Sequence, residues 1–438
     1  MDTPICDFVR RYAESQTLRL HMPGHKGKGP LGFEALDITE IHGADSLYEV
    51  DSIIAQSERN ASLLFGCPTF YSTEGSSQCI RAMLHLATCG KNRKVAAGRN
   101  AHKTFLSAAA LLDLDVDWLY PEDGTAYLSC DIRPEELERY FAACEEIPAA
   151  VYVTSPDYLG NLLDIAGLAA VCHRHSTLLL VDNAHGAYLK FLYNSRHPMD
   201  LGADLCCDSA HKTLPVLTGG AYLHIRNGVL AKRAKNALSL FGSTSPSYLI
   251  MQSLDAANDY LSQDYRGNLA SFLHKLEGLR LWLGAQGYCF LGNEPLKLTI
   301  AAKLYGYTGT QLAAALRQQG IECEFADPDY LVLMPTPTMT PAELKQLEDT
   351  LIAIPRRPAI SDIRPAFSCS QKVLSIRDAL LSPAEIIPVS ESEGCILAAA
   401  SVGCPPAVPI LVCGEKIDKS AIACFQYYGI DTCSVVQR

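Results

Sequence analysis

Between about residues 51 and 225 the chain alternates short apolar runs with amphipathic stretches, and this alternation limits the possible folds most. Fully apolar runs separated by helices are typical of a mostly parallel sheet covered on both faces. We therefore predict an α/β fold with one large sheet. The strand-like runs include KVAAG at 94–98, AAVYVTS at 149–155, TLLLVD at 177–182 and GGAYLHI at 219–225, and the helical stretches include SSQCIRAMLHLATCG at 76–90 and RPEELERYFAACEE at 133–146.

The same pattern predicts how the 438 residues are divided, since this length suggests about two or three domains with a large core. Residues 1–40 form an N-terminal arm and residues 41–265 the large α/β domain. Residues 266–355, in which strand-like and helical segments alternate again, form a small α+β domain. Residues 356–438 begin with a proline-rich linker and end in a C-terminal domain.

Composition excludes several classes of protein. With 48% hydrophobic and 19% charged residues the chain is too apolar for a disordered protein, and its net charge of −11 argues against a nucleic-acid partner. The N-terminus lacks the basic start and apolar run of a signal peptide, and no apolar stretch approaches the ~20 residues that span a bilayer. The 17 cysteines include no C-x-x-C pair. We expect reduced thiols in the core of a cytoplasmic protein that has no membrane partner.

The motif DSAHKT at 208–213 follows an apolar run and precedes a glycine pair. Lys212 is placed there to form an imine, while Ser209 and His211 are placed to bind an anionic group. A surface lysine after a strand is the alternative interpretation. Asp182, which ends the run LLLVD and is followed by His185, favours the functional interpretation of Lys212 over a surface lysine. Ligands of open α/β sheets collect outside the carboxyl ends of the strands, although an aspartate there is also a good helix cap.

Two further segments supply groups of the same kind. TEGSSQ at 73–78 opens a helix with Gly75, Ser76 and Ser77, and such a helix N-terminus offers free N–H groups to a phosphate. In RNAHKT at 99–104, His102 follows a strand-like run and is able to stack on a planar ligand. Ordinary capping and a structural histidine are the alternatives. Together the lysine, the carboxylate, the phosphate cradle and the histidine predict a site for pyridoxal 5'-phosphate.

The sequence resembles the Orn/Lys/Arg decarboxylase family, whose members use pyridoxal phosphate and have the aspartate aminotransferase-like fold type I. The resemblance implies a mostly parallel seven-stranded sheet in the large domain and small α+β domains at the C-terminal side. It extends over nearly the whole chain, through LHMPGHKG, EGSSQ, RNAHKT, TSPDYLGNLLDI, VDNAHGAYL, DSAHKTLPVLTGGAYLHI, STSPSYLIMQSLD and EGCILAAASVGCPPAVPILVCGE.

This resemblance implies a role for each residue at the site. Lys212 would hold the cofactor through an imine, Asp182 would keep the ring nitrogen protonated, His102 would stack on the ring, and His185 would lie beside it. Lys212 or His211 would return a proton to Cα after carbon dioxide leaves. The phosphate would be bound by Gly75, Ser76, Ser77, Ser209 and His211, with Thr244 or Ser245 reaching it from the second subunit of a homodimer.

The C-terminal part departs from the family pattern, which leaves the substrate less certain than the cofactor. Gly394, Cys395 and Ile396 stand where the family has G-R-I, and PPAVP at 405–409 stands where it has P-P-G-I-P. Glu415 is a candidate to contact the distal amine of a basic substrate, and a turn acid is the alternative. Tyr158 is a candidate to line the pocket, and it is equally a turn residue. The two histidines at 21 and 25 have no acidic or cysteine cluster to complete a metal site.

The predicted reaction is decarboxylation of lysine, arginine or ornithine to the corresponding amine, and the product would serve polyamine biosynthesis. Transamination or β-elimination on the same cofactor is an alternative, because this fold hosts many reactions. The late arginines that would anchor a transaminase substrate, namely Arg356, Arg357 and Arg364, lie in the predicted linker. A catalytically silent homologue is the third possibility.

Overall fold

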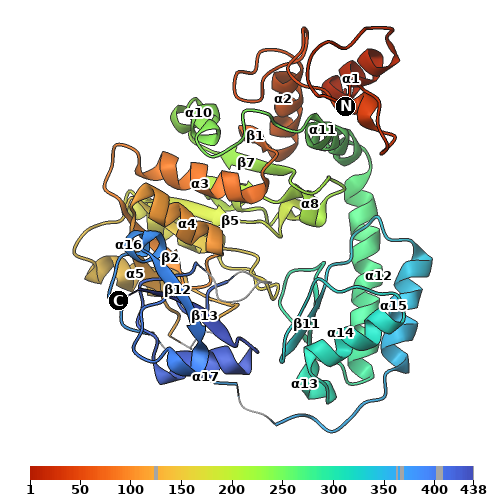
Figure 1. Ribbon diagram of the computed structural model, residues 1–438. Coiled ribbons are helices and arrows are strands. Elements are labelled where there is room, and N and C mark those ends of the chain that lie inside the picture. Colours follow the sequence, from red (N-terminus) through yellow and green to blue (C-terminus); the bar gives the residue numbers. More distant parts are fainter. Residues whose placement is uncertain (123–126, 362–363, 366–368, 401–407, 438) are drawn as a thin grey trace. The chain divides into compact units, whose positions relative to one another are not determined.

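The computed structural model describes residues 1–438 apart from 123–126, 362–363, 366–368, 401–407 and 438. The chain forms two compact units (Figure 1). Unit 1 comprises Met1–Lys91 and Cys172–Ala270, and unit 2 comprises Asn92–Val171 and Ser271–Arg438. Each unit joins two distant segments, whereas the four regions predicted from the sequence are successive stretches of chain. The boundaries of those regions stay a prediction.

The main sheet has seven strands in the order β1-β7-β6-β5-β4-β2-β3. The pairs β2–β3, β2–β4 and β5–β6 are parallel, and the pairs β1–β7 and β6–β7 are antiparallel. The predicted α/β fold with a mostly parallel seven-stranded sheet is therefore confirmed. The strands are β1 (Thr69–Ser72), β2 (Lys94–Gly98), β3 (Asp115–Leu119), β4 (Ala150–Thr154), β5 (Leu178–Asp182), β6 (Leu205–Asp208) and β7 (Ala221–Ile225).

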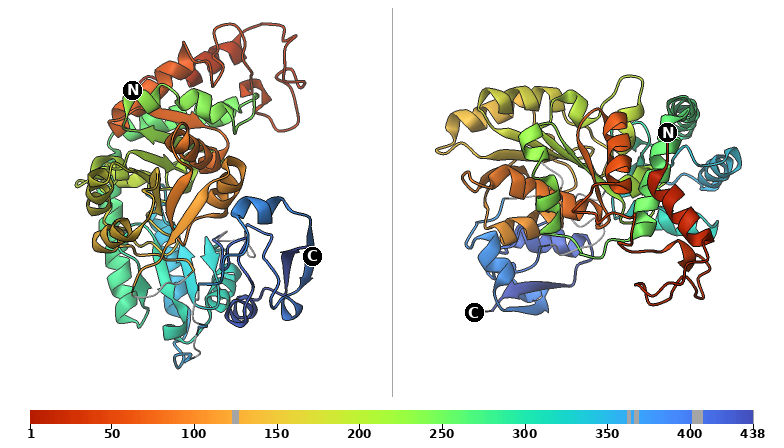
Figure 2. Two further views of the ribbon diagram at one scale, coloured as in Figure 1. Left: turned by 90° about the vertical axis from the view of Figure 1, so that its left-hand side faces the viewer. Right: turned by 90° about the horizontal axis from the view of Figure 1, so that it is seen from above.

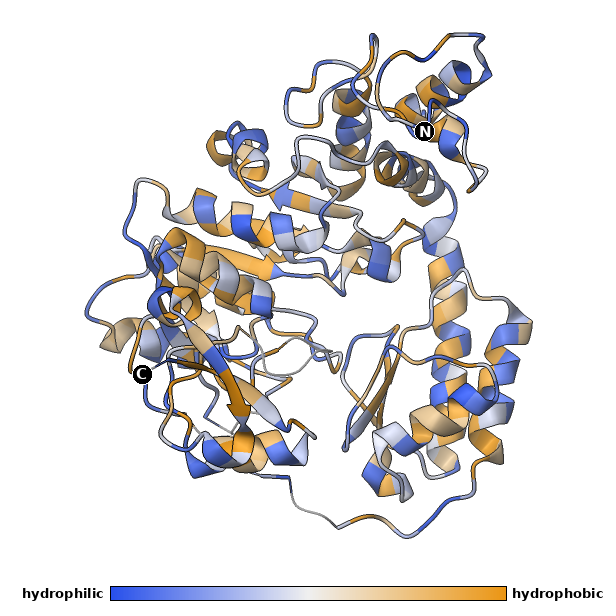
Figure 3. Ribbon diagram, in the orientation of Figure 1, coloured by the Kyte–Doolittle hydropathy of each residue, from blue (hydrophilic) through white to orange (hydrophobic). Residues whose placement is uncertain are grey.

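Unit 1 contains β1, β5, β6 and β7 together with most of the N-terminal helices. Strand β5 is coloured as apolar over most of its length in Figure 3, and Leu180, Cys206 and Leu223 in β5, β6 and β7 are fully buried. The chain between α1 and α2 is mostly loop, interrupted by the short helix η1 (Figure 2). The helices are α1 (Pro4–Glu14), η1 (Glu34–Leu36), α2 (Ile53–Phe65), α3 (Gly75–Thr88), η2 (Ala187–Phe191), α7 (Pro198–Leu201), α8 (Ala210–Thr213), α9 (Gly228–Ala231), α10 (Ala234–Ser239) and α11 (Tyr248–Ser262).

Unit 2 contains β2, β3 and β4 and a second, antiparallel sheet in the order β10-β11-β9-β8. In α15 a capping box between Thr340 and Glu343 starts the helix. The elements are α4 (Lys103–Leu112), α5 (Pro134–Ala143), β8 (Phe290–Leu291), β9 (Leu298–Ala301), α13 (Ala302–Tyr305), α14 (Gly309–Gln318), β10 (Phe325–Ala326), β11 (Tyr330–Leu333) and α15 (Pro341–Ala353), and α6 (Ile165–Arg174) and α12 (Tyr265–Ala285) have residues in both units.

The C-terminal part of unit 2 is built on a two-stranded antiparallel sheet, β12 paired with β13. Leu397, Leu411 and Phe425 pack in a buried cluster with Val435 of β13. Of the PPAVP segment, residues 405–407 lie outside the described residues. Within the described ranges, no helix is both long enough and apolar enough to cross a membrane. The elements are α16 (Ile376–Leu381), β12 (Ala384–Pro388), η3 (Val389–Glu391), α17 (Lys419–Tyr427) and β13 (Thr432–Val436).

Candidate active site

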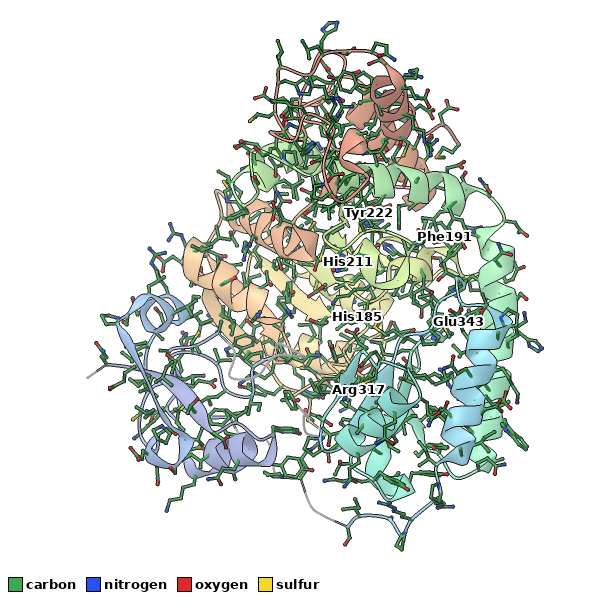
Figure 4. The ribbon with its side chains drawn as sticks, turned by 45° about the vertical axis from the view of Figure 1, so that its right-hand side comes forward. His185, Phe191, His211, Tyr222, Arg317 and Glu343 are labelled. Carbon is green, nitrogen blue, oxygen red and sulfur yellow. The ribbon has the colours of Figure 1, made fainter. Side chains whose placement is uncertain are left out.

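Lys212 and His185 face each other at the carboxyl ends of two neighbouring parallel strands of unit 1. The Nζ atom of Lys212 lies 3.0 Å from Nε2 of His185. Lys212 is in α8, which begins directly after Ser209 beyond the end of β6, and His185 follows the end of β5. Figure 4 labels His185 together with His211, the neighbour of Lys212 in α8. The amine that is predicted to form the imine thus has an imidazole within hydrogen-bond distance.

Asp182 is the last residue of β5 and is only 3% exposed. Its Oδ1 atom accepts the backbone N–H of Ala184 at 3.2 Å and lies 3.7 Å from Sγ of Cys207 on β6. Burial raises the pKa of the Cys207 thiol well above its usual value, so the sulfur is protonated and donates to the carboxylate. A carboxylate held in this way can face a protonated ring nitrogen.

Two hydroxyls meet where the start of α3 approaches the start of α8. Oγ of Ser209 donates to Oγ of Ser76 at 2.8 Å. Gly75, the first residue of α3, has a φ of +68°, a conformation that favours glycine. Its N–H donates to the carbonyl of Gly219 at 2.8 Å. Ser77 follows in the first turn of α3, whose 14 residues give the helix N-terminus a positive end for an anion.

His211 and the glycine pair close the other side of this cradle. Nδ1 of His211 lies 3.0 Å from the carbonyl of Gly220, so this nitrogen carries the proton and donates it. Gly219 has a φ of +99°, and a Cβ there would lie 2.9 Å from the carbonyl oxygen of Thr73. The turn that follows α8 therefore approaches the segment before α3 more closely than any residue with a side chain allows.

The predicted phosphate contacts Thr244 and Ser245 lie in an exposed segment of unit 1. This segment precedes α11, which begins with Ser247 as its N-cap. The N–H of Ser245 donates to Oγ of Ser243 at 3.0 Å. An exposed hydroxyl segment is compatible with the predicted contact to a second subunit, which stays a prediction.

His102, Tyr158 and Glu415 lie in unit 2. His102 is the N-cap of α4, where its Nδ1 accepts the N–H of Thr104 at 3.2 Å. The hydroxyl of Tyr158 donates to Glu324 at 3.0 Å. These contacts agree with the structural interpretations of both residues, and their predicted roles at the cofactor stay predictions.

Glu415 is buried against an arginine. Its carboxylate lies 3.5 Å from the guanidinium of Arg99 and accepts the N–H of Val412 at 2.9 Å. Burial raises the pKa of Glu415, and Arg99 acts in the opposite direction. Arg99 also donates to the carbonyls of Pro409 and Ile410. This pairing favours a structural role for Glu415, so its predicted contact to a substrate amine has no support from these bonds.

The residues of unit 1 fit pyridoxal phosphate. Two hydroxyls and a helix N-terminus can donate to a phosphate, and the buried Asp182 matches a protonated ring nitrogen. The predicted contact of His211 to the phosphate stays a prediction. Lys212 supplies the amine for the aldehyde carbon. The hydroxyl Oγ1 of Thr213, buried beside Lys212, has no hydrogen-bond partner among the described residues, as expected where a polar ligand belongs.

Two neighbours of these groups were not predicted from the sequence. Cys207 was assigned to packing, although its thiol contacts Asp182. Asp208, directly before the S-x-H-K motif, is fully buried between His197 and His224. A charged residue at the end of an apolar strand was the available signal for Asp208. Its histidine partners are 11 and 16 residues away, and only the folded sheet brings them together.

The comparisons with known proteins agree with this geometry. Residues 3–280 match the family model described as Orn/Lys/Arg decarboxylase, major domain. The chain is 29% identical to the arginine decarboxylase of Bacillus subtilis (strain 168), covering 96% of this chain and 92% of the relative, and it is equally similar over the same shares to the arginine decarboxylase of Halalkalibacterium halodurans. The constitutive lysine decarboxylase of E. coli has the same fold, with a TM-score of 0.80 and 16% identity over 100% of this chain and 82% of that one.

The family model covers more than half of the chain, and the relatives named above match this chain over nearly its full length. The predicted resemblance and the predicted class of enzyme, an amino-acid decarboxylase, are thereby confirmed. This chain belongs to the Orn/Lys/Arg decarboxylase family.

Proposed function

We propose that this chain decarboxylates arginine to agmatine and carbon dioxide. The observation that carries the proposal is the arrangement of Lys212, His185 and Asp182 at the ends of β5 and β6. Arginine is favoured over lysine and ornithine because relatives named arginine decarboxylase match over 94–96% of this chain at 28–29% identity. A curated relative named lysine decarboxylase is 25% identical and matches only 54% of the chain.

Each residue of the site has a defined task in this proposal. Pyridoxal phosphate, when bound, supplies a conjugated ring that withdraws electrons from the bond to the carboxylate of the substrate. Asp182 would hold a proton at the ring nitrogen, with the Cys207 thiol fixing its Oδ1 atom. Ser76, Ser209 and the N-terminus of α3 would bind the phosphate and so fix the position of the ring.

Proton movement is assigned to the pair of Lys212 and His185. A lysine attacks an aldehyde only as the neutral amine, and His185, at 3.0 Å from Nζ, is placed to accept its proton. After carbon dioxide leaves, the same amine would give a proton to Cα of the product. His211 is less suited to that step, because its Nδ1 proton is donated to the carbonyl of Gly220.

The alternative transaminase needs an arginine late in the chain for the substrate carboxylate. Arg357 instead lies over the ring of Tyr307, with the guanidinium carbon 4.2 Å from the ring centroid. Arg364 donates to the hydroxyl of Tyr330 at 3.2 Å. These contacts give both arginines a structural role and favour the decarboxylase over the transaminase.

We further propose a homodimer with shared active sites that works in the cytoplasm and supplies polyamine biosynthesis. The dimer is supported by the exposed segment of Thr244 and Ser245 and by exposed apolar side chains between α1 and α2, such as Leu20 at 83% exposure. The 16 cysteines among the described residues are all free thiols, as is usual in a reducing compartment.

The test is a substrate panel. Purified protein with pyridoxal phosphate is incubated with arginine, lysine, ornithine and other amino acids, and amine and carbon dioxide are measured by mass spectrometry. We expect agmatine as the main product and its loss in Lys212→Ala. Cadaverine or putrescine as the main product would overturn the choice of arginine, and keto-acid products would overturn decarboxylation.

A further inference from the structure

Asp208 is the last residue of β6, directly before the segment that carries Lys212. Its side chain is bound by residues of three separate segments of unit 1. Its Oδ2 atom is 3.0 Å from Nε2 of His197 and 3.0 Å from Nε2 of His224. Its Oδ1 atom accepts the Nδ2 proton of Asn183 at 2.6 Å. Asp208 and all three partners are fully buried. Asp208 takes no part in the chemistry proposed above.

The protons in this cluster can be counted. Nδ1 of His197 accepts the N–H of Met199 at 3.3 Å, so the proton of His197 is on Nε2, which faces Asp208. A nitrogen that carries a proton cannot bind a metal ion. The three residues could otherwise supply ligand atoms within 4.8 Å of one another. The proton on His197 therefore argues against a metal site here.

His224 carries both of its protons. The hydroxyl of Thr69 donates to the carbonyl of Cys67 at 3.0 Å, so it receives a hydrogen bond from Nδ1 of His224, 2.9 Å away. Burial lowers the pKa of His224, but the Asp208 carboxylate outweighs that effect and raises it. Four donors therefore converge on Asp208: the two histidines, Asn183 and the thiol of Cys206, whose sulfur lies 3.8 Å from Oδ1. An ionised carboxylate accepts from all of them.

The bond between Asp208 and Asn183 links the two strand ends that carry the site. At the carboxyl ends of β5 and β6 a backbone bond runs from the N–H of Asn183 to the carbonyl of Cys207, at 3.0 Å. The side-chain bond adds one more link beyond it. Asn183 directly follows Asp182, and Asp208 directly precedes Ser209 and the segment with Lys212. One short bond thus joins the two segments where they leave the sheet.

We propose that Asp208 is a positioning residue that acts through Asn183. It holds the exits of β5 and β6 together, so that Asp182 and Lys212 keep the separation the cofactor needs. His197 and His224 keep the carboxylate ionised and oriented from α7 and β7. A displacement of about 1 Å in such a site can cost about 100-fold in rate, so a bond at the base of both segments affects catalysis directly.

The test uses Asn183→Ala, which removes the link and leaves the ion pair of Asp208 and His224 in place. We expect kcat to fall about tenfold with little change in KM, because the geometry of the reacting groups changes more than substrate binding. The visible circular dichroism of the lysine-bound cofactor, recorded without substrate, should change shape. Asp208→Asn should give the same changes, and the double variant should lose little more than either single one.

Asp204→Asn is the matched control. Asp204 is a buried carboxylate at the amino end of β6, where it accepts the N–H of Leu179 at 2.8 Å and contacts His173 at 3.0 Å. This control should lower Tm without changing the visible circular dichroism or kcat. Unchanged dichroism and kcat in a folded Asn183→Ala protein would overturn the proposal, as would additive losses in the double variant. The kinetic readout rests on the proposed function, whereas the dichroism stays informative even if arginine is not the substrate.

Discussion

The hydrogen bond from the Cys207 thiol to Asp182 predicts how the cofactor affinity depends on Cys207. The thiol donates to Asp182 Oδ1 from 3.7 Å, and Cys207→Ala would remove that donor. We expect the Kd of pyridoxal phosphate to rise about threefold, since a hydrogen bond to a charged group contributes on the order of 1 kcal/mol and a thiol is a weak donor. Fluorescence titration of the cofactor-free protein measures this. Cys172→Ala, at a fully buried thiol of unit 1 away from these groups, is the control and should leave Kd unchanged.

The buried pair of Asp208 and His224 predicts how stability depends on pH. Burial alone would raise the pKa of Asp208, but the two histidines outweigh it and hold the pKa well below its usual range. Its contribution is therefore present above about pH 4 and is lost as the pH falls further. The pKa of His224 is raised, so its contribution is complete below about pH 6.5 and is lost as the pH rises through the higher folded value.

We therefore expect the free energy of unfolding to be greatest at about pH 5 to 6 and to fall on either side. Urea denaturation of the cofactor-free protein across this range measures it. Asp208→Asn should flatten the profile on both sides, because the titrating carboxyl is removed and His224 loses its charged partner. A variant with the same profile as the parent would show that the pair does not ionise as described.

Single residues differ in how far their role follows from the sequence. The placement of Asp182 and Lys212 beyond neighbouring strands was predictable, because Asp182 ends one apolar run and Lys212 follows the end of the next. Asp208 and Cys207 were not, because their functions depend on partners across the sheet. A sequence pattern shows what a residue follows, but it does not show what a side chain meets on the next strand.

Among the structural elements, the turn after α8 depends on one glycine. With a φ of +99° and a Cβ that would lie 2.9 Å from the carbonyl of Thr73, Gly219→Ala must move the turn or the segment before α3. We expect a loss of about 1 kcal/mol or more and weaker cofactor binding. Gly278→Ala in α12, where a Cβ meets nothing within 4 Å, should instead raise stability by about 0.5–1 kcal/mol. Thermal denaturation compares the two variants.

Elements with local signals were predicted well. The helical stretch predicted at 133–146 forms α5, which has Pro134 in its first turn, a position that favours a helix start. The exposed strand β12 was not predicted, since it is paired only with β13 nearly fifty residues later. A strand without a buried face has no apolar alternation, so its formation depends on a partner that a local pattern cannot supply.

For the whole molecule, the proposed homodimer predicts a role for the loop between α1 and α2. Leu18 and Leu20 are 78% and 83% exposed there. If a second copy covers them, replacing both by serine should raise the dimer Kd at least about tenfold, since each buried leucine contributes about 1.5 kcal/mol or more. Analytical ultracentrifugation measures this. Leu381→Ser, at an exposed leucine of α16, is the control. An unchanged dimer in the double variant would exclude this loop from the interface.

The buried pair of Arg99 and Glu415 has a consequence for synthesis of the chain. Arg99 stands just after β2, yet the carbonyl of Pro409, to which it donates, is 310 residues away. At about 5–20 residues per second, a ribosome needs about 15–60 s to make the stretch between them. For that time the arginine is without these partners, and β2 cannot reach its final surroundings. Unit 2 therefore completes its fold only after Pro409 and Glu415 have been made, and a chain truncated before Glu415 leaves Arg99 without its carboxylate.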